Sequence, residues 1–195
     1  MKTLLLFLLL LPIPYVAYFH GNFLPFPLGY LFLYVLVPFL AALILGFHPK
    51  DLGLSRGKRE GYKLALILLL LSIPLSLAGT LIPEMRSYYP IFPYETPIEF
   101  IAGELKMALF MFAHEFFYRG VLLFPLARRN KWGTILAQNV PYTLVHIGKP
   151  AVEIPYAFVA GIIFADLDLR AESIFPSFLL HWLGSMIFDV MCGVM

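Results

Sequence analysis

The chain has 195 residues, of which 61% are hydrophobic and 13% charged. Soluble domains contain about 45–50% apolar and about 25% charged residues, so this composition indicates an integral membrane protein, one domain covering residues 1–195. The net charge of +2 does not indicate nucleic-acid binding. The one cysteine, Cys192, excludes an intrachain disulfide and a cysteine-based metal site, and we expect it to be a small apolar packing residue.

Seven apolar stretches predict an all-α polytopic bundle of about seven transmembrane helices, within a range of six to eight. They are residues 3–19, 28–47, 63–82, 100–124, 132–148, 152–168 and 174–193. The first follows Lys2 and is Leu-rich, as a signal peptide is, but it lacks a small-residue cleavage site, so we expect an uncleaved helix. Prolines within the stretches predict kinks, which are tolerated where protein or a wet cavity satisfies the freed backbone groups.

Lysine and arginine are unequally divided between the two sides that seven alternating helices define. One side receives ten of them: Lys2, Lys50, Arg56, Lys58, Arg59, Lys63, Arg128, Arg129, Lys131 and Arg170. The other side receives Arg86 and Lys149, with Lys106 near the end of the fourth helix. Because cationic loops are retained in the cytoplasm, the N-terminus is predicted to be cytoplasmic and the C-terminus to lie outside.

Polar side chains are concentrated in three of the predicted helices. The fourth carries His114, Glu115 and Arg119, the fifth ends with Tyr142 and His146, and the seventh carries His181, Ser185 and Asp189. A charge at mid-bilayer costs about 2.5–3.5 kcal/mol, so charged residues there are expected to be functional. Glu115 and Arg119 are four residues apart and are predicted to pair along one helical face. We also expect Glu115, His146 and His181 to converge on one pocket within the membrane.

A zinc site is the alternative use of these side chains. His114, His146, His181 and Glu115 are all possible zinc ligands. One turn after Glu115, however, the chain carries Arg119 rather than the second histidine of a zinc-protease helix, and a fixed cation is an unfavourable neighbour for a metal dication. We therefore predict no metal and no other cofactor.

Other charged residues near these helices have simpler interpretations. Lys149 is expected to extend its ammonium to the membrane interface. Asp166 and Asp168 are expected to lie in a solvated loop.

Three motifs in this order resemble those of one family, the CAAX prenyl protease and bacteriocin-processing (CPBP, or Abi) family of intramembrane proteases. They are His114-Glu115-x-x-x-Arg119 for the family's Glu-Glu-x-x-x-Arg, Tyr142-x-x-x-His146 for Phe-x-x-x-His, and His181-x-x-x-Ser185 for His-x-x-x-Asn. The similarity covers about residues 50–190, including Asp51-Leu52-Gly53-Leu54, and it implies a protease core at about residues 100–192.

The resemblance implies a multi-pass intramembrane endopeptidase of a prokaryotic plasma membrane. Its substrates would be membrane-tethered peptides or protein termini, either CAAX-type or sorting and maturation signals. The catalytic residues would be Glu115, His146, His181 and His114, with support from Arg119 and Ser185.

Position 114 departs from the family pattern, in which a glutamate there is read as the general base. The resemblance leaves three candidates for that role: His114, Glu115, or a replacement carboxylate from Glu153.

Two other classes of function remain open. One is a non-catalytic membrane scaffold or immunity protein of the same fold. The other is a small proton-coupled transporter, although no inverted repeat is visible in the chain.

Overall fold

The computed structural model describes residues 1–194, and over this range the chain is helical and contains no β-strand. Short breaks divide several of the long segments into consecutive helices. The elements are α1 (Lys2–Leu10), α2 (Ile13–His20), η1 (Gly21–Phe23), α3 (Leu28–Leu31), η2 (Phe32–Leu36), α4 (Val37–Ile44), η3 (Pro49–Leu52), α5 (Arg59–Gly79), α6 (Pro83–Tyr88), α7 (Pro97–Glu115), η4 (Phe116–Leu123), α8 (Phe124–Ala127), α9 (Lys131–Leu144), α10 (Glu153–Ala171) and α11 (Phe175–Val194).

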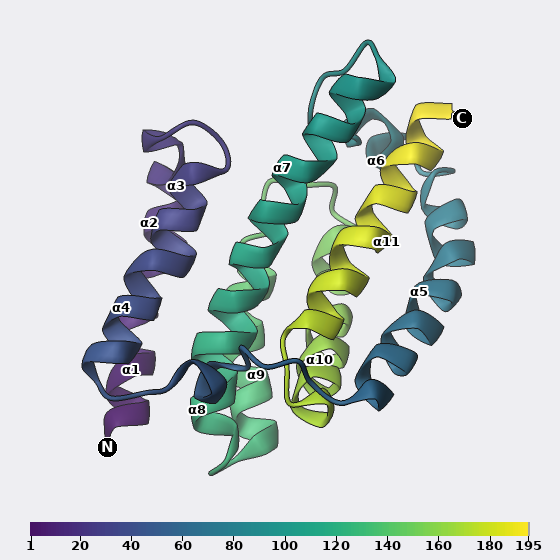
Figure 1. Cartoon of the computed structure of the whole chain (residues 1–195). Coiled ribbons are helices and arrows are strands. Elements are labelled where there is room, and N and C mark those ends of the chain that lie inside the picture. Colours follow the sequence, from purple (N-terminus) through teal and green to yellow (C-terminus); the bar gives the residue numbers. More distant parts are fainter. Residues whose placement is uncertain (195) are drawn as a thin grey trace.

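The helices form a bundle in which successive long segments run in alternating directions (Figure 1). Four segments are long and apolar enough to cross a membrane: Lys2–Phe23, Arg59–Gly79, Pro97–Ala127 and Phe175–Val194. These match four of the predicted spans, and the expectation of an all-α helical membrane bundle is confirmed. The segment Leu28–Ile44 and helix α9 are shorter than these spans, and α10 carries several charged residues. The total of seven crossings stays a prediction.

The long segment from α7 through η4 to α8 lies at the centre of the bundle. Helices α1 to α4 are on one side of it, and α10, α11 and α5 are on the other (Figure 1). Within its most apolar window, 78% of the central segment is buried, against 11% for α5. Helix α5 accordingly exposes Leu66, Ile67 and Leu71, as expected of a helix that faces lipid. The central segment is therefore the place where polar side chains are shielded from lipid.

Local sequence signals fix where the central segment begins. Thr96 accepts a hydrogen bond from the backbone N–H of Glu99, and the Glu99 carboxylate accepts one from the backbone N–H of Thr96. Pro97 occupies the first helical position, where its missing N–H leaves no partner unsatisfied. This reciprocal cap explains why α7 begins three residues before the predicted span at residue 100.

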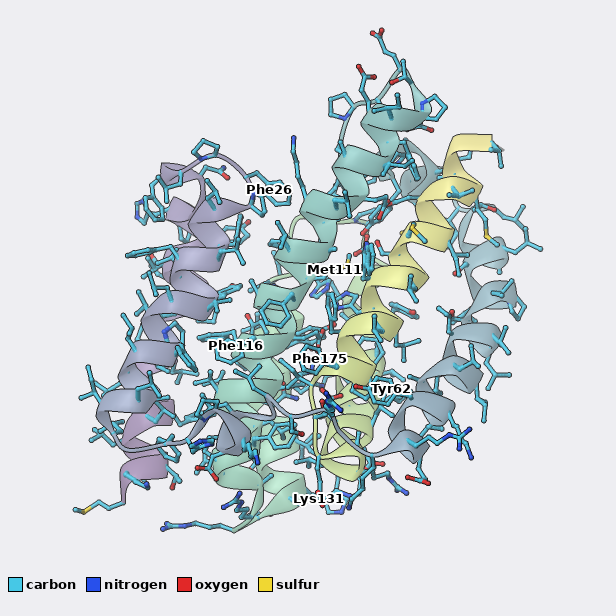
Figure 2. All side chains as sticks on the ribbon, viewed as in Figure 1. Phe26, Tyr62, Met111, Phe116, Lys131 and Phe175 are labelled. Atoms are coloured by element: carbon cyan, nitrogen blue, oxygen red, sulfur yellow. The ribbon has the colours of Figure 1, made fainter. Side chains whose placement is uncertain are left out.

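One end of the bundle collects the cationic loops, and we call it the basic end. It contains the N-terminus, the connection from α4 to α5, the α8–α9 turn and the α10–α11 turn (Figure 1). All ten lysines and arginines predicted to share one side lie in these segments or at the adjoining ends of the helices that they connect. Lys131 marks this end in Figure 2.

At the basic end, the loop formed by residues 53–58 is hydrogen-bonded to the α10–α11 turn, and we call this loop the strap. Three of the four bonds use backbone groups of the strap, and one uses the Ser55 hydroxyl. The bonds run from Ile174 N to Gly53 O (3.1 Å), from Ser173 Oγ to Ser55 O (2.7 Å), from Ser55 Oγ to Glu172 O (2.5 Å) and from Lys58 N to Ala171 O (2.8 Å). Gly57 has φ of +72°, and a side chain there would also contact Ser173. The strap thus joins the connection before α5 to the turn before α11.

Candidate functional site

The site is built around Glu115, the last residue of α7. The next eight residues form the π-helix η4, and Arg119 lies on the same face as Glu115, four positions later. Arg119 Nε is 3.2 Å from Glu115 Oε2, and both side chains are completely buried. The predicted pairing of Arg119 with Glu115 is confirmed. Because each charge offsets the other, neither is left alone in a low-dielectric interior.

Helix α11 supplies two further partners for the Glu115 carboxylate. His181 Nδ1 lies 2.7 Å from Oε1, and the Ser177 hydroxyl donates to Oε2 at 3.1 Å. A carboxylate accepts hydrogen bonds only, so Nδ1 of His181 carries a proton and donates it. In the neutral imidazole, Nε2 is then the unprotonated nitrogen and faces away from Glu115.

Asp168 of α10 extends this cluster. Its carboxylate lies 2.5 Å from Ser177 Oγ, so Asp168 and Glu115 share the one hydrogen of that hydroxyl. It also accepts the Ser177 backbone N–H at 3.1 Å, which satisfies a free donor in the first turn of α11. Asp168 is completely buried. The expectation that it lies in a solvated loop is wrong, because α10 continues to Ala171 and packs this face against the start of α11.

Asp166 was expected to lie in the same loop, and this expectation is also wrong. It lies in α10, and its side chain is only 22% exposed. Its carboxylate is 2.6 Å from Lys131 Nζ and accepts a hydrogen bond from Arg170 Nε at 2.6 Å. Asp166 therefore belongs to the basic end rather than to the Glu115 cluster.

Helix α9 contributes Tyr142, and His146 follows two residues after the helix ends. The Cζ atom of Arg119 lies 3.9 Å from the centroid of the Tyr142 ring, which gives the buried guanidinium a second favourable contact. His146 Nδ1 is 2.9 Å from the carbonyl oxygen of Tyr142. A backbone carbonyl only accepts, so this nitrogen is the donor, and the unprotonated nitrogen of neutral His146 is again Nε2.

His114 occupies an aromatic environment. Its ring centroid is 5.1 Å from that of Tyr118, 5.2 Å from Phe110, 5.4 Å from Tyr34 and 5.9 Å from Tyr142. Within residues 1–194, no hydrogen bond to its imidazole is found. The side chain is nevertheless close enough to His146 and His181 to interact with them electrostatically.

The packing around η4 separates this polar face from an apolar one. Phe116 lies on the side of the central segment that faces α4, where its ring is 6.1 Å from that of Phe39 (Figure 2). Met111 and Phe175 lie on the side of α11 (Figure 2). Glu115 and His181 are in direct contact, and His114 and His146 are close enough to each other and to His181 to interact electrostatically.

Ser185 and Glu153, two other predicted participants, lie apart from this cluster. Ser185 is partly buried and makes no hydrogen bond with the described part of the chain. Glu153 accepts a hydrogen bond from the Tyr89 hydroxyl at 2.7 Å and lies 3.4 Å from Lys149 Nζ. The proposed replacement carboxylate is therefore engaged with a cation and a phenol at the end opposite the basic end.

Glu104 is a buried polar residue that sequence reasoning missed. It lies on α7 at 3% exposure and within hydrogen-bond reach of Asp189 of α11, which is 1% exposed. As carboxylates, both groups only accept; the described range offers them no cation in hydrogen-bond contact, and the indole of Trp182 is the donor closest to the Glu104 carboxylate. Lys149 interacts electrostatically with Asp189, but its ammonium pairs with Glu153. A lone glutamate in an apolar stretch gave no sign that its partner lay far along the chain.

Metal ligands are not grouped in the described part of the molecule. Within residues 1–194, no group of three or more His, Cys, Asp or Glu side chains is arranged to hold a metal ion.

The second half of the chain is similar to a known family. Residues 99–187 match the family model described as type II CAAX prenyl endopeptidase Rce1-like. Neither a curated protein nor a solved structure matches the chain. The matched segment contains Glu115, Arg119, His146 and His181, and the resemblance to CAAX proteases inferred from the motifs is confirmed. Residues 99–187 of this helical membrane protein are thus similar to the Rce1-like type II CAAX prenyl endopeptidases.

Proposed function

We propose that the protein is an intramembrane endopeptidase that cleaves membrane-tethered peptides or protein termini of the CAAX or sorting-signal type. The observation that carries the proposal is the contact between Glu115 and His181 inside the segment that matches the protease family. A carboxylate that holds Nδ1–H of a histidine leaves Nε2 as a base, which is how carboxylate–histidine pairs activate nucleophiles in hydrolases.

In this mechanism, Glu115 positions a base rather than acting as one. Its carboxylate already contacts Arg119, His181 and Ser177, and it is completely buried. Nε2 of His181 takes a proton from water as the oxygen attacks the scissile carbonyl carbon, and Glu115 stabilises the resulting imidazolium. The same proton then passes to the leaving amine when the C–N bond breaks. Atoms and charges balance with water as the only co-reactant.

His146 and His114 complete the proposed reaction centre. The unprotonated Nε2 of His146 accepts a hydrogen bond from the attacking water and orients it. His114 occupies the position of the family's first glutamate, where it serves as a second proton acceptor or as a donor to the oxyanion. Ser185 makes no hydrogen bond to any of these groups, so we give it no part in the reaction. Water and imidazoles suffice for this chemistry, so we propose a mechanism without a metal.

The membrane setting determines which substrates reach the site. Glu115 lies twelve residues before the end of the span Pro97–Ala127, a distance of about 18 Å along a helix at 1.5 Å per residue. The hydrocarbon core is about 30 Å thick, so the site lies near mid-membrane. We propose a multi-pass protein whose basic end, with the N-terminus, faces the cytoplasm. A scissile bond must then enter from the lipid phase, as a tethered or apolar peptide does.

The decisive experiment measures cleavage by the purified full chain in nanodiscs, with an internally quenched peptide that carries a prenylated cysteine. His181→Ala is expected to lower kcat/KM by about 10²–10⁴-fold, the usual contribution of a general base. His20→Ala is the matched control, because His20 lies at an exposed helix end outside the cluster. A chelator should leave the rate unchanged. A folded wild-type chain that cleaves no such peptide would support the non-catalytic scaffold instead, and proton-linked uptake in proteoliposomes would support the transporter.

The role of position 114 needs its own pair of variants. If His114 transfers protons, His114→Ala lowers turnover strongly with little change in folding, and His114→Glu, which restores the family pattern, retains or raises activity. His114→Phe serves as the packing control, because it keeps an aromatic ring among Tyr34, Phe110 and Tyr118. Turnover within a few fold of wild type in all three variants would leave His114 with a packing role only.

A further inference from the structure

A cavity of about 450 Å³ lies at the basic end, where the connection from α4 to α5, the α8–α9 turn and the end of α10 meet. Its polar lining includes Lys50, Arg128, Lys131 and Glu172. Phe124 supplies part of an apolar wall. The volume falls within the range of about 300–1,000 Å³ that is usual for small-molecule sites. The cavity is separate from the Glu115 cluster and has no part in the proposed hydrolysis.

The charges around this cavity are not balanced within the protein. Glu172 is neutralised by Lys58, whose Nζ lies 2.7 Å from its carboxylate. Arg128 contacts Asp51 at 3.0 Å, and Lys131 contacts Asp166. Lys50 also lines the cavity, but its ammonium has no carboxylate partner within residues 1–194. The cavity therefore has an excess of positive charge and suits an anion.

Arg128 lies where this cavity meets a second one. The second cavity, of about 200 Å³, is lined by Arg128 together with Lys2 and Arg129. The Arg128 side chain is 75% exposed, so its contact with Asp51 is a weak surface ion pair. Its guanidinium can therefore turn from Asp51 to an incoming anion at little cost. A planar guanidinium offers two parallel N–H donors, a geometry that fits phosphate oxygens.

The position of the cavity relative to the membrane indicates which kind of anion can reach it. Trp132, next to Lys131, is 58% exposed, and exposed tryptophans beside cationic residues gather at the membrane–water interface. The apolar surface that extends from this level along the bundle is the part that lipid chains cover. Cationic pockets between membrane helices at this depth bind the headgroups of anionic lipids. We propose that the cavity binds the phosphate headgroup of an anionic glycerophospholipid, with Lys50 and Arg128 as its principal ligands.

The test uses the full chain in a neutral detergent and dioctanoyl phosphatidylglycerol as the probe, with binding counted by native mass spectrometry. The double variant Lys50→Gln/Arg128→Gln is expected to weaken the apparent Kd roughly thirtyfold, since each cation near an anionic membrane surface contributes about 1 kcal/mol, or about fivefold. The matched control is Arg59→Gln/Lys63→Gln, which removes two cations from the same end without touching either cavity.

Comparison ligands distinguish the lipid from other sources of the same charge. Dioctanoyl phosphatidylcholine, with no net charge, should bind at least tenfold more weakly than phosphatidylglycerol, and inorganic phosphate at the same concentration should not displace it. If both double variants lost affinity for phosphatidylglycerol equally, the proposed site would be wrong, because the effect would then come from general surface charge. Equal binding of the two lipids, or displacement by phosphate alone, would overturn the headgroup assignment. Size-exclusion profiles verify that each variant is folded.

Discussion

Two acidic clusters lie along the same pair of helices, α7 and α11, and they differ in what neutralises them. Glu115 meets a guanidinium, an imidazole and a hydroxyl. Glu104 and Asp189, equally buried, meet each other and form no ion pair with a cation within residues 1–194. Two touching carboxyl groups without a cation are stable together when they share a proton. The charge of a buried carboxyl group in this protein therefore depends on which groups contact it and not on burial alone.

The largest expected effect follows from removing the charge of Glu115. Glu115→Gln leaves Arg119 as a buried cation without its ion-pair partner, so the free energy of unfolding should fall by about 3–5 kcal/mol. Asp51→Asn, which removes a surface carboxylate paired with Arg128, is the control and should change it by less than about 1 kcal/mol. Thermal unfolding followed by size-exclusion chromatography measures both. A Glu115→Gln protein as stable as wild type would show that other groups neutralise Arg119.

The second effect concerns the hydroxyl that links two carboxylates. Ser177→Ala removes the donor shared by Glu115 and Asp168, and each is left with one buried oxygen less satisfied. The expected loss is about 1–3 kcal/mol. Ser185→Ala on the same helix is the matched control, because Ser185 makes no hydrogen bond within the described residues. Equal stability of the two variants would show that the Ser177 hydroxyl does not stabilise the Glu115 and Asp168 carboxylates.

The third effect should be small although the residue is fully buried. In Glu104→Gln the amide donates to Asp189 as a protonated carboxyl group does, so the free energy of unfolding should change by no more than about 1 kcal/mol. The measurement is the same unfolding assay, with Glu115→Gln as the reference. A loss as large as that of Glu115→Gln would break the comparison, since it would mean that both carboxylates are ionised and that a cation lies between them.

The smallest effect depends on pH and concerns an exposed carboxylate. The backbone N–H of His48 and the neighbouring Arg128 lower the pKa of Asp51 below its usual 3.8. A lowered folded-state pKa stabilises the protein above the unfolded pKa and loses this contribution as pH falls through the folded value. Wild type should therefore exceed Asp51→Asn slightly in thermal stability above about pH 4, and the difference should vanish on further acidification. A difference that persists at pH 2 would contradict this origin.

The sequence predicted the parts of the structure that follow from local patterns. Apolar stretches located the main helices, and a spacing of four residues paired Glu115 with Arg119. The contact of His181 with Glu115 was correctly expected. The convergence of His146 on the same pocket stays a prediction. Asp168 was misread because the alternation Asp-Leu-Asp-Leu-Arg looks like a solvated helix end. Its partner Ser177 lies across a turn, and only the packing of α10 on α11 brings the two together. Glu104 and Asp189 were not paired because contacts between distant helices leave no periodic signal in one sequence.

The strap has a practical consequence for anyone who wishes to isolate the protease region. It begins and ends well before residue 99, yet its backbone accepts and donates hydrogen bonds at the α10–α11 turn, which holds Asp168 and Ser177 in register. A fragment cut to residues 99–187 would lack the strap. The polar groups of the α10–α11 turn that bind the strap would then lose their partners, and the turn that supports Glu115 would loosen. Residues 99–187 therefore do not form a portable module, and residues 53–58 of the chain act as part of their scaffold.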